Sequence, residues 1–392
     1  MNSLILNTEV QEFINTHLND DTHRLLLGRE VFKGISNQEL VEQIESKRKT
    51  KNKLPNWFSG DNIYYPKKLN LEQTSSETTA AFKSELPVLR GNRLADLTGG
   101  LGIDSYYFSK QFNEVTHFEI NTDLSEIALH NFKQLGCDNI NCMAQDGIDY
   151  LKATSETFDV IYVDPSRRND AKGKVVLLSD CAPDVSQEID FLLSKARQVV
   201  IKTSPLLDIS NGIRELNSVK EIHVIAVNNE AKELLFIAEA NYSGAIQVVT
   251  TNLKKTDTEE FKFIWGEKTT RRYSLPLNYL YEPNVAIMKS GAFHQVTKAF
   301  TVQKLQEHSH LYTSETLVYF PGRTFIIKDV IKYQKKIIKK QFGGSQANIA
   351  TRNFPKTVAY LRKELAIKDG GDRYLFFTTD LNNNKVMLLC EK

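Results

Sequence analysis

The sequence predicts an α/β protein with a doubly wound parallel sheet, preceded by a helical region and followed by a smaller α+β region. Three observations predict this architecture. Residues 1–89 show helical spacing of apolar side chains, and from about Arg90 to Asn241 apolar runs alternate with amphipathic segments. A glycine-rich turn follows the first of those runs, where a parallel sheet binds ligands.

Composition bounds the class of protein. The chain has 392 residues, of which 41% are hydrophobic and 25% charged, as expected for two or three globular domains. No apolar run approaches the roughly 18 residues that span a bilayer, and the N-terminus resembles no secretory signal. We therefore expect a cytoplasmic protein without membrane contact.

Cysteine spacing and net charge limit which sites the protein can have. The four cysteines are scattered without a CxxC pair, so we expect neither a metal site nor a disulfide framework. The formal net charge is only +2. Any affinity for nucleic acid must therefore come from local basic patches.

The first 89 residues are expected to be helical. Apolar residues from Val10 to Leu18 recur at helical spacing, and Ser36 and Glu39 form the pattern of a capping box. A basic run at 47–53 precedes two aromatic residues. Such a run is typical of an RNA contact or, at least as often, of a solvated helix end.

The glycine-rich turn at residues 96–104 is the most informative motif. Asp96 ends the first apolar run, and three glycines, 99, 100 and 102, lead into a helical stretch. Glycine is required where the backbone adopts positive φ or approaches a ligand. The dinucleotide fingerprint would have another glycine where this chain has Ser105, so a dinucleotide is disfavoured.

Two more acids follow apolar runs. Glu119 lies 23 residues after Asp96, where a doubly wound fold places a carboxylate on ribose hydroxyls. Asp164 and Pro165 end the apolar run that begins at Phe158. Both acids should lie at the carboxyl edge of the sheet.

Further elements are expected along the rest of the chain. The pattern predicts a helix at 122–135 and another at 328–342. Strands are predicted at 199–203, 221–227, 234–240, 245–250, 261–265, 317–320, 324–327, 374–378 and 386–389. On the second helix, one face should carry six lysines that could follow a phosphate backbone, namely Lys328, Lys332, Lys335, Lys336, Lys339 and Lys340.

The turn and its surroundings resemble a known family. Asp-x-Thr-Gly-Gly-x-Gly at 96–102 is similar to motif I of class I methyltransferases, which have a Rossmann-like sheet and use S-adenosylmethionine. Together with 74–76, 164–168, 281–291 and 361–375, it resembles bacterial class I methyltransferases with a C-terminal THUMP-like domain. The resemblance implies a methyltransferase domain at 90–275 after the helical region at 1–89, a ferredoxin-like domain at 276–318 and a THUMP-like domain at 319–392.

The resemblance also implies a cofactor site and a substrate. Asp146 falls where such enzymes place an acid near the adenine amino group, and the segment before motif I covers the methionine tail. The implied S-adenosylmethionine site comprises Thr74, Ser75, Ser76, Asp96, Thr98, Gly99, Gly100, Gly102, Asp104, Glu119 and Asp146. THUMP domains belong to RNA-modifying enzymes, so the expected substrate is rRNA or tRNA.

The implied catalytic motif is Asp164, Pro165, Ser166 and Arg167, followed by Arg168. It resembles the Asp-Pro-Pro-Tyr motif of amino methyltransferases, but Ser166 and Arg167 replace its second half. An arginine plane can stack on a base or hold a phosphate, so a nitrogen of an RNA base is the expected target. The motif has no cysteine, which disfavours carbon methylation, and Cys181 is more simply a buried thiol. Two alternatives stay open: methylation of a small molecule or protein, and a non-catalytic RNA-binding protein with this fold.

Overall fold

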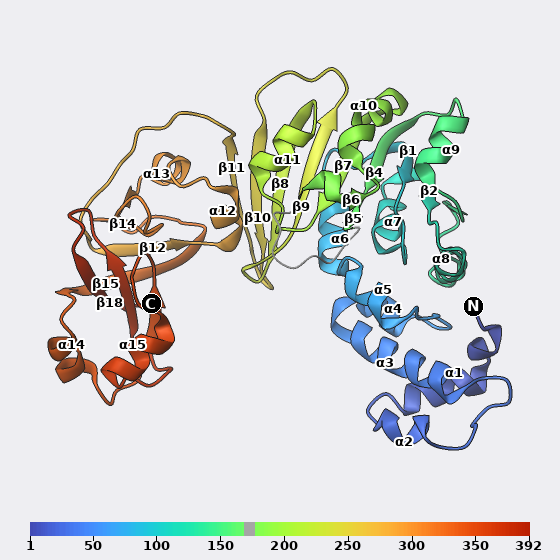
Figure 1. Cartoon of the computed structure of the whole chain (residues 1–392), viewed down its shortest axis with the longest axis horizontal. Helices are drawn as coiled ribbons and strands as arrows, with labels where there is room; N and C mark the ends of the chain where they lie inside the picture. Colours follow the sequence, from blue (N-terminus) through green and yellow to red (C-terminus); the bar gives the residue numbers. More distant parts are fainter. Residues whose placement is uncertain (168–176) are drawn as a thin grey trace. The chain divides into compact units, whose positions relative to one another are not determined.

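The computed structural model describes residues 1–167 and 177–392 (Figure 1). The chain divides into two compact units. The first comprises Met1–Ile222 and Lys232–Gly244, and the second comprises His223–Ala231 and Ala245–Lys392. The finer boundaries expected near 90, 276 and 319 stay a prediction.

The N-terminal region is helical, as predicted. Its elements are η1 (Ser3–Leu6), α1 (Thr8–Thr16), α2 (Thr22–Leu26), α3 (Asn37–Lys53), α4 (Pro55–Ser59), α5 (Lys68–Gln73) and α6 (Glu77–Ser84). The predicted capping box is confirmed, because Ser36 accepts from the Glu39 amide while the Glu39 side chain binds the Ser36 amide. The basic run at 47–53 is largely engaged within the protein: Lys47 is buried beside the rings of Phe58 and Tyr65.

A nine-stranded sheet follows. Its strands are β1 (Gly91–Asp96), β2 (Phe112–Phe118), β3 (Ile140–Met143), β4 (Phe158–Val163), β7 (Ala196–Thr203), β8 (Val219–Val227), β9 (Glu230–Glu239), β10 (Gln247–Leu253) and β11 (Thr258–Ile264). The order is β11-β10-β8-β9-β7-β4-β1-β2-β3. The connecting elements are α7 (Ile103–Phe108), α8 (Thr122–Gln134), α9 (Gly147–Ala153), β5 (Ser166–Arg167), η2 (Leu178–Asp180), β6 (Cys181–Ala182), α10 (Val185–Lys195) and α11 (Ile209–Glu215).

The sheet has a topological switch point between β1 and β4. From β1 the chain moves outward through β2 and β3, then returns to place β4 on the other side of β1. All these neighbours are parallel, as is β7 beside β4, whereas β9 is antiparallel to β7. The predicted α/β class is confirmed. A ligand is expected at the carboxyl ends of β1 and β4.

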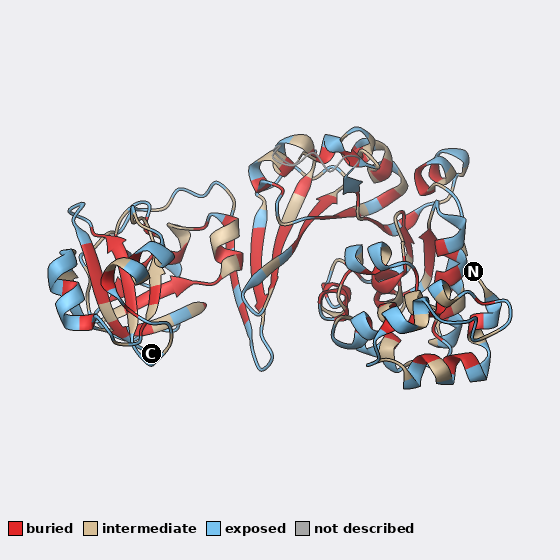
Figure 2. Ribbon diagram, turned by 60° about the horizontal axis from the view of Figure 1, so that its bottom comes forward, coloured by how far each residue is buried: buried red, intermediate tan, exposed pale blue. Residues whose placement is uncertain are grey.

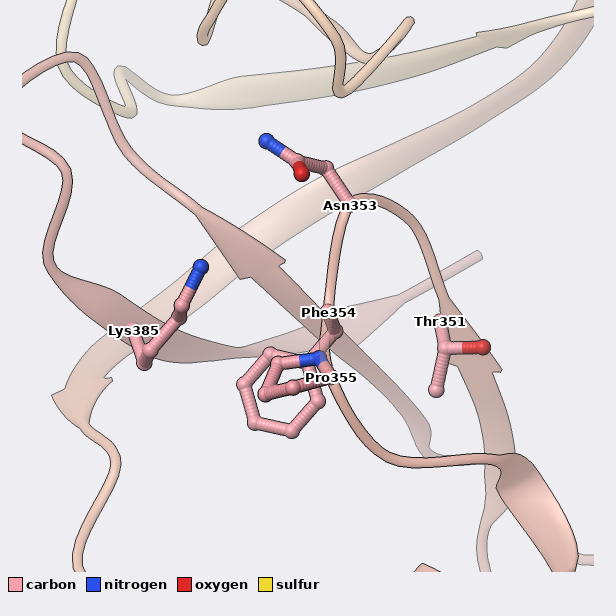
Figure 3. A pocket seen from close by; sticks show the side chains of 5 residues that line it. All are labelled: Thr351, Asn353, Phe354, Pro355 and Lys385. Carbon is pink, nitrogen blue, oxygen red and sulfur yellow. The ribbon is translucent and has the colours of Figure 1, made fainter.

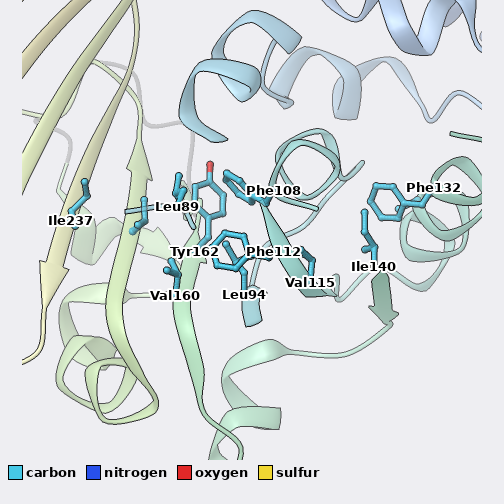
Figure 4. Packing of buried hydrophobic residues seen from close by; sticks show 12 residues of the cluster. Leu89, Leu94, Phe108, Phe112, Val115, Phe132, Ile140, Val160, Tyr162 and Ile237 are labelled. Atoms are coloured by element: carbon cyan, nitrogen blue, oxygen red, sulfur yellow. The ribbon is translucent and has the colours of Figure 1, made fainter. Parts of the chain in front are cut away.

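The core of the first unit fixes these strand ends. Leu94 and Val115 are fully buried on β1 and β2, and they pack in one cluster with Val160 and Tyr162 of β4 and with Phe132 of α8 (Figure 4). The C-terminal halves of β1, β2 and β4 are continuously buried, and buried segments run through the sheet in Figure 2. Such near-continuous burial is typical of a parallel sheet covered on both faces.

The second unit contains a seven-stranded sheet of its own. Its strands are β12 (Tyr279–Pro283), β13 (Gln303–Lys304), β14 (Tyr312–Ser314), β15 (Gly322–Lys332), β16 (Asn348–Thr351), β17 (Tyr374–Thr379) and β18 (Lys385–Glu391), in the order β13-β14-β12-β15-β18-β17-β16. The helices are α12 (Val285–Ser290), α13 (Gln295–Ala299), α14 (Lys335–Phe342) and α15 (Val358–Leu365).

Two predicted elements are wrong. The predicted helix 328–342 begins only at Lys335, because residues through Lys332 belong to β15 and pair with β18. Residues 317–320 form no strand; the Val318 amide donates to the Tyr281 hydroxyl, 3.1 Å away, instead of to a neighbouring strand. Long-range pairing and side-chain contacts therefore override the local pattern at both places.

Among residues 1–167 and 177–392, no helix combines the length and apolar character needed to cross a membrane.

Candidate functional site

A cavity of about 480 Å³ lies at the carboxyl ends of β1, β2 and β4 in the first unit. Most of the residues predicted to bind cofactor or substrate line it: Thr74, Ser75, Asp96, Thr98, Gly99, Gly100, Asp104, Glu119, Asp146, Asp164 and Ser166. Four predicted residues are not in that lining, namely Ser76, Gly102, Pro165 and Arg167. Ser76 instead caps α6 by accepting from the Thr79 amide.

The glycines of the turn are needed mainly for packing within the protein. Gly100 and Gly102 have φ of +57° and +84°, which disfavours other residues. A Cβ on Gly99 would come within 2.2 Å of the His117 ring, and one on Gly102 within 2.2 Å of the Phe132 ring. Gly100 has no such neighbour, since its nearest atom lies 4.0 Å away. Gly100 is therefore the glycine at which backbone faces open space.

Glu119 is held by the turn on one side and by its own loop on the other. One carboxylate oxygen accepts from the Gly100 amide at 3.0 Å, and the other accepts from the Asn121 amide at 2.8 Å. Each carboxylate oxygen has a second lone pair. The side chain is thus preorganised and can still accept hydrogen bonds from two hydroxyl groups.

Asp146 lies at the N-terminus of α9. Its Oδ1 accepts from the amides of Ile148 and Asp149, at 2.8 and 3.1 Å. The cap fixes the side chain where it lines the cavity. Oδ2 is the atom available to a ligand amino group.

Asp96 is a buried acid at the end of β1, only 1% exposed. Burial raises the pKa of its carboxyl to about 7, with repulsion from Asp104 and Asp164 adding to the shift. Hydrogen bonds from Ser105 and the Thr98 amide act in the opposite direction. A ligand cation at this position would favour the ionised form.

Sequence analysis missed a buried ionic network beside the cavity. Lys83 of α6 is fully buried and contacts Asp104 at 2.9 Å and Glu233 at 3.0 Å. Asp104 also accepts from Ser75 and Tyr162, each at 2.8 Å. Burial opposes ionisation of Asp104, but Lys83 and Lys202 outweigh it and lower its pKa. Lys83 and Glu233 lie 150 residues apart, so no local pattern could have paired them.

Asp164 is paired with a second residue that the sequence analysis missed. In the parallel register Val163 lies beside Ile201, which brings Asp164 next to Lys202 of β7, and these side chains form an ion pair. Burial opposes the charge on Lys202, but Asp164, Asp104 and Glu233 outweigh it and raise its pKa. The Asp164 amide donates to the Thr98 hydroxyl at 2.7 Å, so the glycine-rich turn orients the start of the predicted catalytic motif.

In the rest of the predicted catalytic motif, Pro165 is buried, whereas Ser166 and Arg167 are exposed. Ser166 and Arg167 form β5, which pairs with Ala182 and Cys181 of β6. The Cys181 thiol is buried and its pKa is raised by burial, which is unsuited to nucleophilic attack. Arg168 lies outside the described residues.

The chemistry of the lining limits the kind of ligand that fits. Five carboxylates line the cavity, together with apolar side chains such as Leu97, Phe118 and Ile148. Among the residues described, its lining contains no lysine, arginine or histidine. A pyrophosphate would meet acids here, whereas a ligand with cationic groups, hydroxyls and a planar apolar ring would fit. S-adenosylmethionine has all of these groups.

The six predicted RNA-binding lysines lie in the second unit on two elements. Lys328 and Lys332 belong to β15, and the other four belong to α14. Lys328 pairs with Glu391 at 3.2 Å, and Lys335 with Glu364 at 3.7 Å. All six are exposed, and Lys332, Lys336, Lys339 and Lys340 make no ion pair with any described residue. The prediction that one helix face carries all six lysines is therefore wrong, because α14 carries only four of them.

The second unit also contains a hollow of about 390 Å³. Its lining is Thr351, Asn353, Phe354, Pro355 and Lys385 (Figure 3). Lys385 donates to the Thr379 hydroxyl at 2.6 Å and Asn353 donates to Gln306 at 2.8 Å. Both polar groups are thus engaged within the unit.

Two family models match the C-terminal part of the chain. A ferredoxin-like domain matches residues 279–321, and a THUMP domain-like model matches residues 322–392.

A solved structure matches the whole chain. It is the crystal structure of a "putative methyltransferase" from Porphyromonas gingivalis W83, which is 31% identical and superimposes with a TM-score of 0.89. The match covers 100% of this chain and 98% of that one. The chain belongs to the bacterial class I methyltransferases with a C-terminal THUMP-like domain. The sheet order and the cavity at its switch point are therefore those of a methyltransferase family member.

A curated relative matches a shorter part. An "Uncharacterized RNA methyltransferase MMOB5020" of Mycoplasma mobile is 38% identical over 73 residues, which are 19% of this chain and 20% of that protein. The chain thus matches about a fifth of the length of this relative.

Proposed function

We propose that this methyltransferase uses S-adenosylmethionine to methylate a nitrogen of an RNA base in rRNA or tRNA. The observation that carries the proposal is the cavity at the switch point, whose described lining holds five acids and no basic side chain. That lining fits a cation with ribose hydroxyls and an adenine ring, and it does not fit a dinucleotide.

Different residues of the cavity would bind different parts of the cofactor. Glu119 would accept from the ribose hydroxyls and Asp146 from the adenine amino group, while Ile148 and Phe118 would contact the ring. Asp96 is the most buried of the five acids and would interact with the cationic end of the cofactor. Thr74 and Ser75 line the cavity at the segment before β1.

When bound, S-adenosylmethionine supplies an electrophilic methyl group. The protein has to align the target nitrogen and accept a hydrogen bond from its N–H. Asp164 suits this role because Lys202 pairs with Oδ2, which leaves Oδ1 to face the substrate as a carboxylate acceptor. Ser166 and the exposed Arg167 are placed to contact a base or a phosphate.

Three observations support RNA as the substrate. The Mycoplasma mobile relative is named an RNA methyltransferase, and residues 322–392 match a THUMP-like domain. Within these residues, four exposed lysines form no ion pair with the described residues. Methylation of a small molecule or protein is the second candidate. It is favoured by the absence of an aromatic side chain in the Asp164-Pro165-Ser166-Arg167 motif.

Comparing RNA nucleosides from cells with and without the gene tests the proposal. Mass spectrometry should show that one methylated nucleoside disappears on deletion and returns with the wild-type gene but not with an Asp164→Asn variant. An unchanged set of nucleosides would refute an RNA substrate, and restoration by the Asp164→Asn variant would refute the catalytic role.

A further inference from the structure

A short helix of the N-terminal region forms part of the cofactor cavity. Asn70 and Gln73 of α5, and Thr74 and Ser75 just after it, belong to the cavity lining. α5 spans only Lys68–Gln73, and a helix of six residues is unstable by itself. Other contacts must hold it in place.

Leu71 provides the apolar contact. It is 3% exposed and packs in a cluster with Leu54 and Trp57 of the N-terminal region. The same cluster contains Leu101 and Leu124, which also line the cavity. The wall formed by α5 and the wall formed by the glycine turn thus share one core.

The polar contact comes from the last residue of α3. Lys53 Nζ donates to the carbonyl oxygens of Leu71 and Glu72, at 2.7 and 3.0 Å. Carbonyls in the last turn of a helix have no partner within the helix, and a cation is favoured there. Neighbouring Lys49 binds only the side chain of Glu72, at 2.9 Å, and that pair is exposed.

The other end of the segment is fixed from the sheet side. Ser75 donates to Asp104 at 2.8 Å and accepts from buried Lys83 at 3.1 Å. The chain from α5 to Ser75 is therefore attached at Leu71, at its C-terminal carbonyls and at Ser75. Of these attachments, those through Leu71 and through Lys53 reach back to the preceding N-terminal helices, and the Lys53 attachment is the polar one.

We propose that Lys53 is a positioning residue that holds α5 as a wall of the cofactor cavity, so that the N-terminal helical region sets cofactor affinity. This inference rests on the proposed use of S-adenosylmethionine. Without the two hydrogen bonds, α5 occupies its wall position in a smaller fraction of the molecules. The apparent affinity for the cofactor is proportional to that fraction and therefore falls.

The test measures binding of S-adenosylhomocysteine to the full chain by calorimetry. Lys53→Met should weaken binding about tenfold, since hydrogen bonds from a charged donor are lost. Lys53→Arg, which keeps a charged donor, should restore most of the affinity. Two matched controls on α3 should bind like wild type: Lys51→Met, at an exposed lysine without a hydrogen bond or ion pair to the described residues, and Lys49→Met, which removes only the exposed ion pair.

Hydrogen exchange separates this role from a general loss of stability. In ligand-free Lys53→Met, faster exchange should be confined to residues 68–76, while the core strands stay protected. If that variant does not fold, Lys53→Gln, which keeps an uncharged NH2 donor group, should show intermediate binding and exchange. The inference is overturned if Lys53→Met binds the probe and exchanges like wild type. If Lys53→Met does not fold, the same result in Lys53→Gln overturns it. Failure of the wild-type protein to bind the probe would overturn the proposed cofactor, and this role with it.

Discussion

At the scale of single residues, the site depends on acids that are kept in unlike protonation states. Asp104 has a lowered pKa because two lysines outweigh its burial, whereas Asp96 is buried with no basic partner among the described residues and has a pKa of about 7. Opposite shifts in neighbouring carboxyls are typical of functional sites. Asp96 therefore links ligand binding to pH.

Cofactor affinity should rise with pH through the pKa of Asp96. Below pH 7 its carboxyl is mostly protonated and attracts a cation weakly, so affinity should increase by up to about tenfold per unit below pH 7 and level off above it. The same raised pKa makes the free protein lose stability as pH rises from about 4 to 7, because the folded state binds the proton more tightly. Calorimetry between pH 5.5 and 8.5 measures the slope of cofactor affinity against pH. Asp96→Asn should abolish this slope, and an unchanged slope in that variant would assign the titration to another group.

Asp164 should affect turnover more than cofactor binding. Because Lys202 is buried against it, Asp164→Ala would leave a cation without its partner. Asp164→Asn keeps one oxygen acceptor for Lys202 and places an NH2 donor where Oδ1 would accept from the substrate. We expect Asp164→Asn to lower kcat by about a hundredfold or more while cofactor affinity stays within a few-fold. Arg167→Ala should mainly raise KM for the RNA. Equal loss of turnover and cofactor affinity in Asp164→Asn would instead make Asp164 a cofactor ligand.

At the scale of elements, sequence patterns were sufficient where local preference and tertiary structure agree. The apolar runs ending at Asp96 and Asp164 are central parallel strands, and their burial makes them recognisable. Glu119 was predictable because doubly wound folds repeat that geometry. The acids that line the cavity thus followed from strand ends and motif order.

The remainder depends on contacts between distant residues. Lys328 and Lys332 fit a helical face with the lysines of α14, yet Asp329 to Lys332 pair with β18, beyond a bulge that follows Ile327. The pairing of Lys83 with Glu233 and of Lys202 with Asp164 required the sheet order. Lysine at the end of a buried strand, as at Lys202, was the one signal available in the sequence.

The lysines of β15 and α14 give a prediction about RNA. Replacing Lys332, Lys336 and Lys339 with Ala should weaken binding of all structured RNAs similarly and reduce the salt slope by roughly one unit per lysine. The fold should persist, because buried Ile338 and Phe342 provide the packing of α14. The double variant Lys328→Ala, Lys335→Ala serves as control and should have a smaller effect, since Glu391 and Glu364 already neutralise these lysines. An unchanged salt slope in the triple variant would show that this surface does not contact RNA.

At the scale of the whole molecule, the two units offer separate chemistry. The first contains a cavity lined by acids at the switch point of a methyltransferase sheet. The second contains the THUMP-like match and four exposed lysines that form no ion pair with the described residues. In this account the first unit binds the cofactor and carries out methyl transfer, and the second binds the RNA. Both roles require that the cavity holds S-adenosylmethionine.

Calorimetry with S-adenosylmethionine, S-adenosylhomocysteine and NAD tests that claim most directly. The account predicts that the first two bind to the purified protein, that NAD does not, and that Glu119→Ala weakens binding by about 1.5–3 kcal/mol through lost ribose contacts. Tight binding of NAD with no signal for S-adenosylmethionine would contradict it.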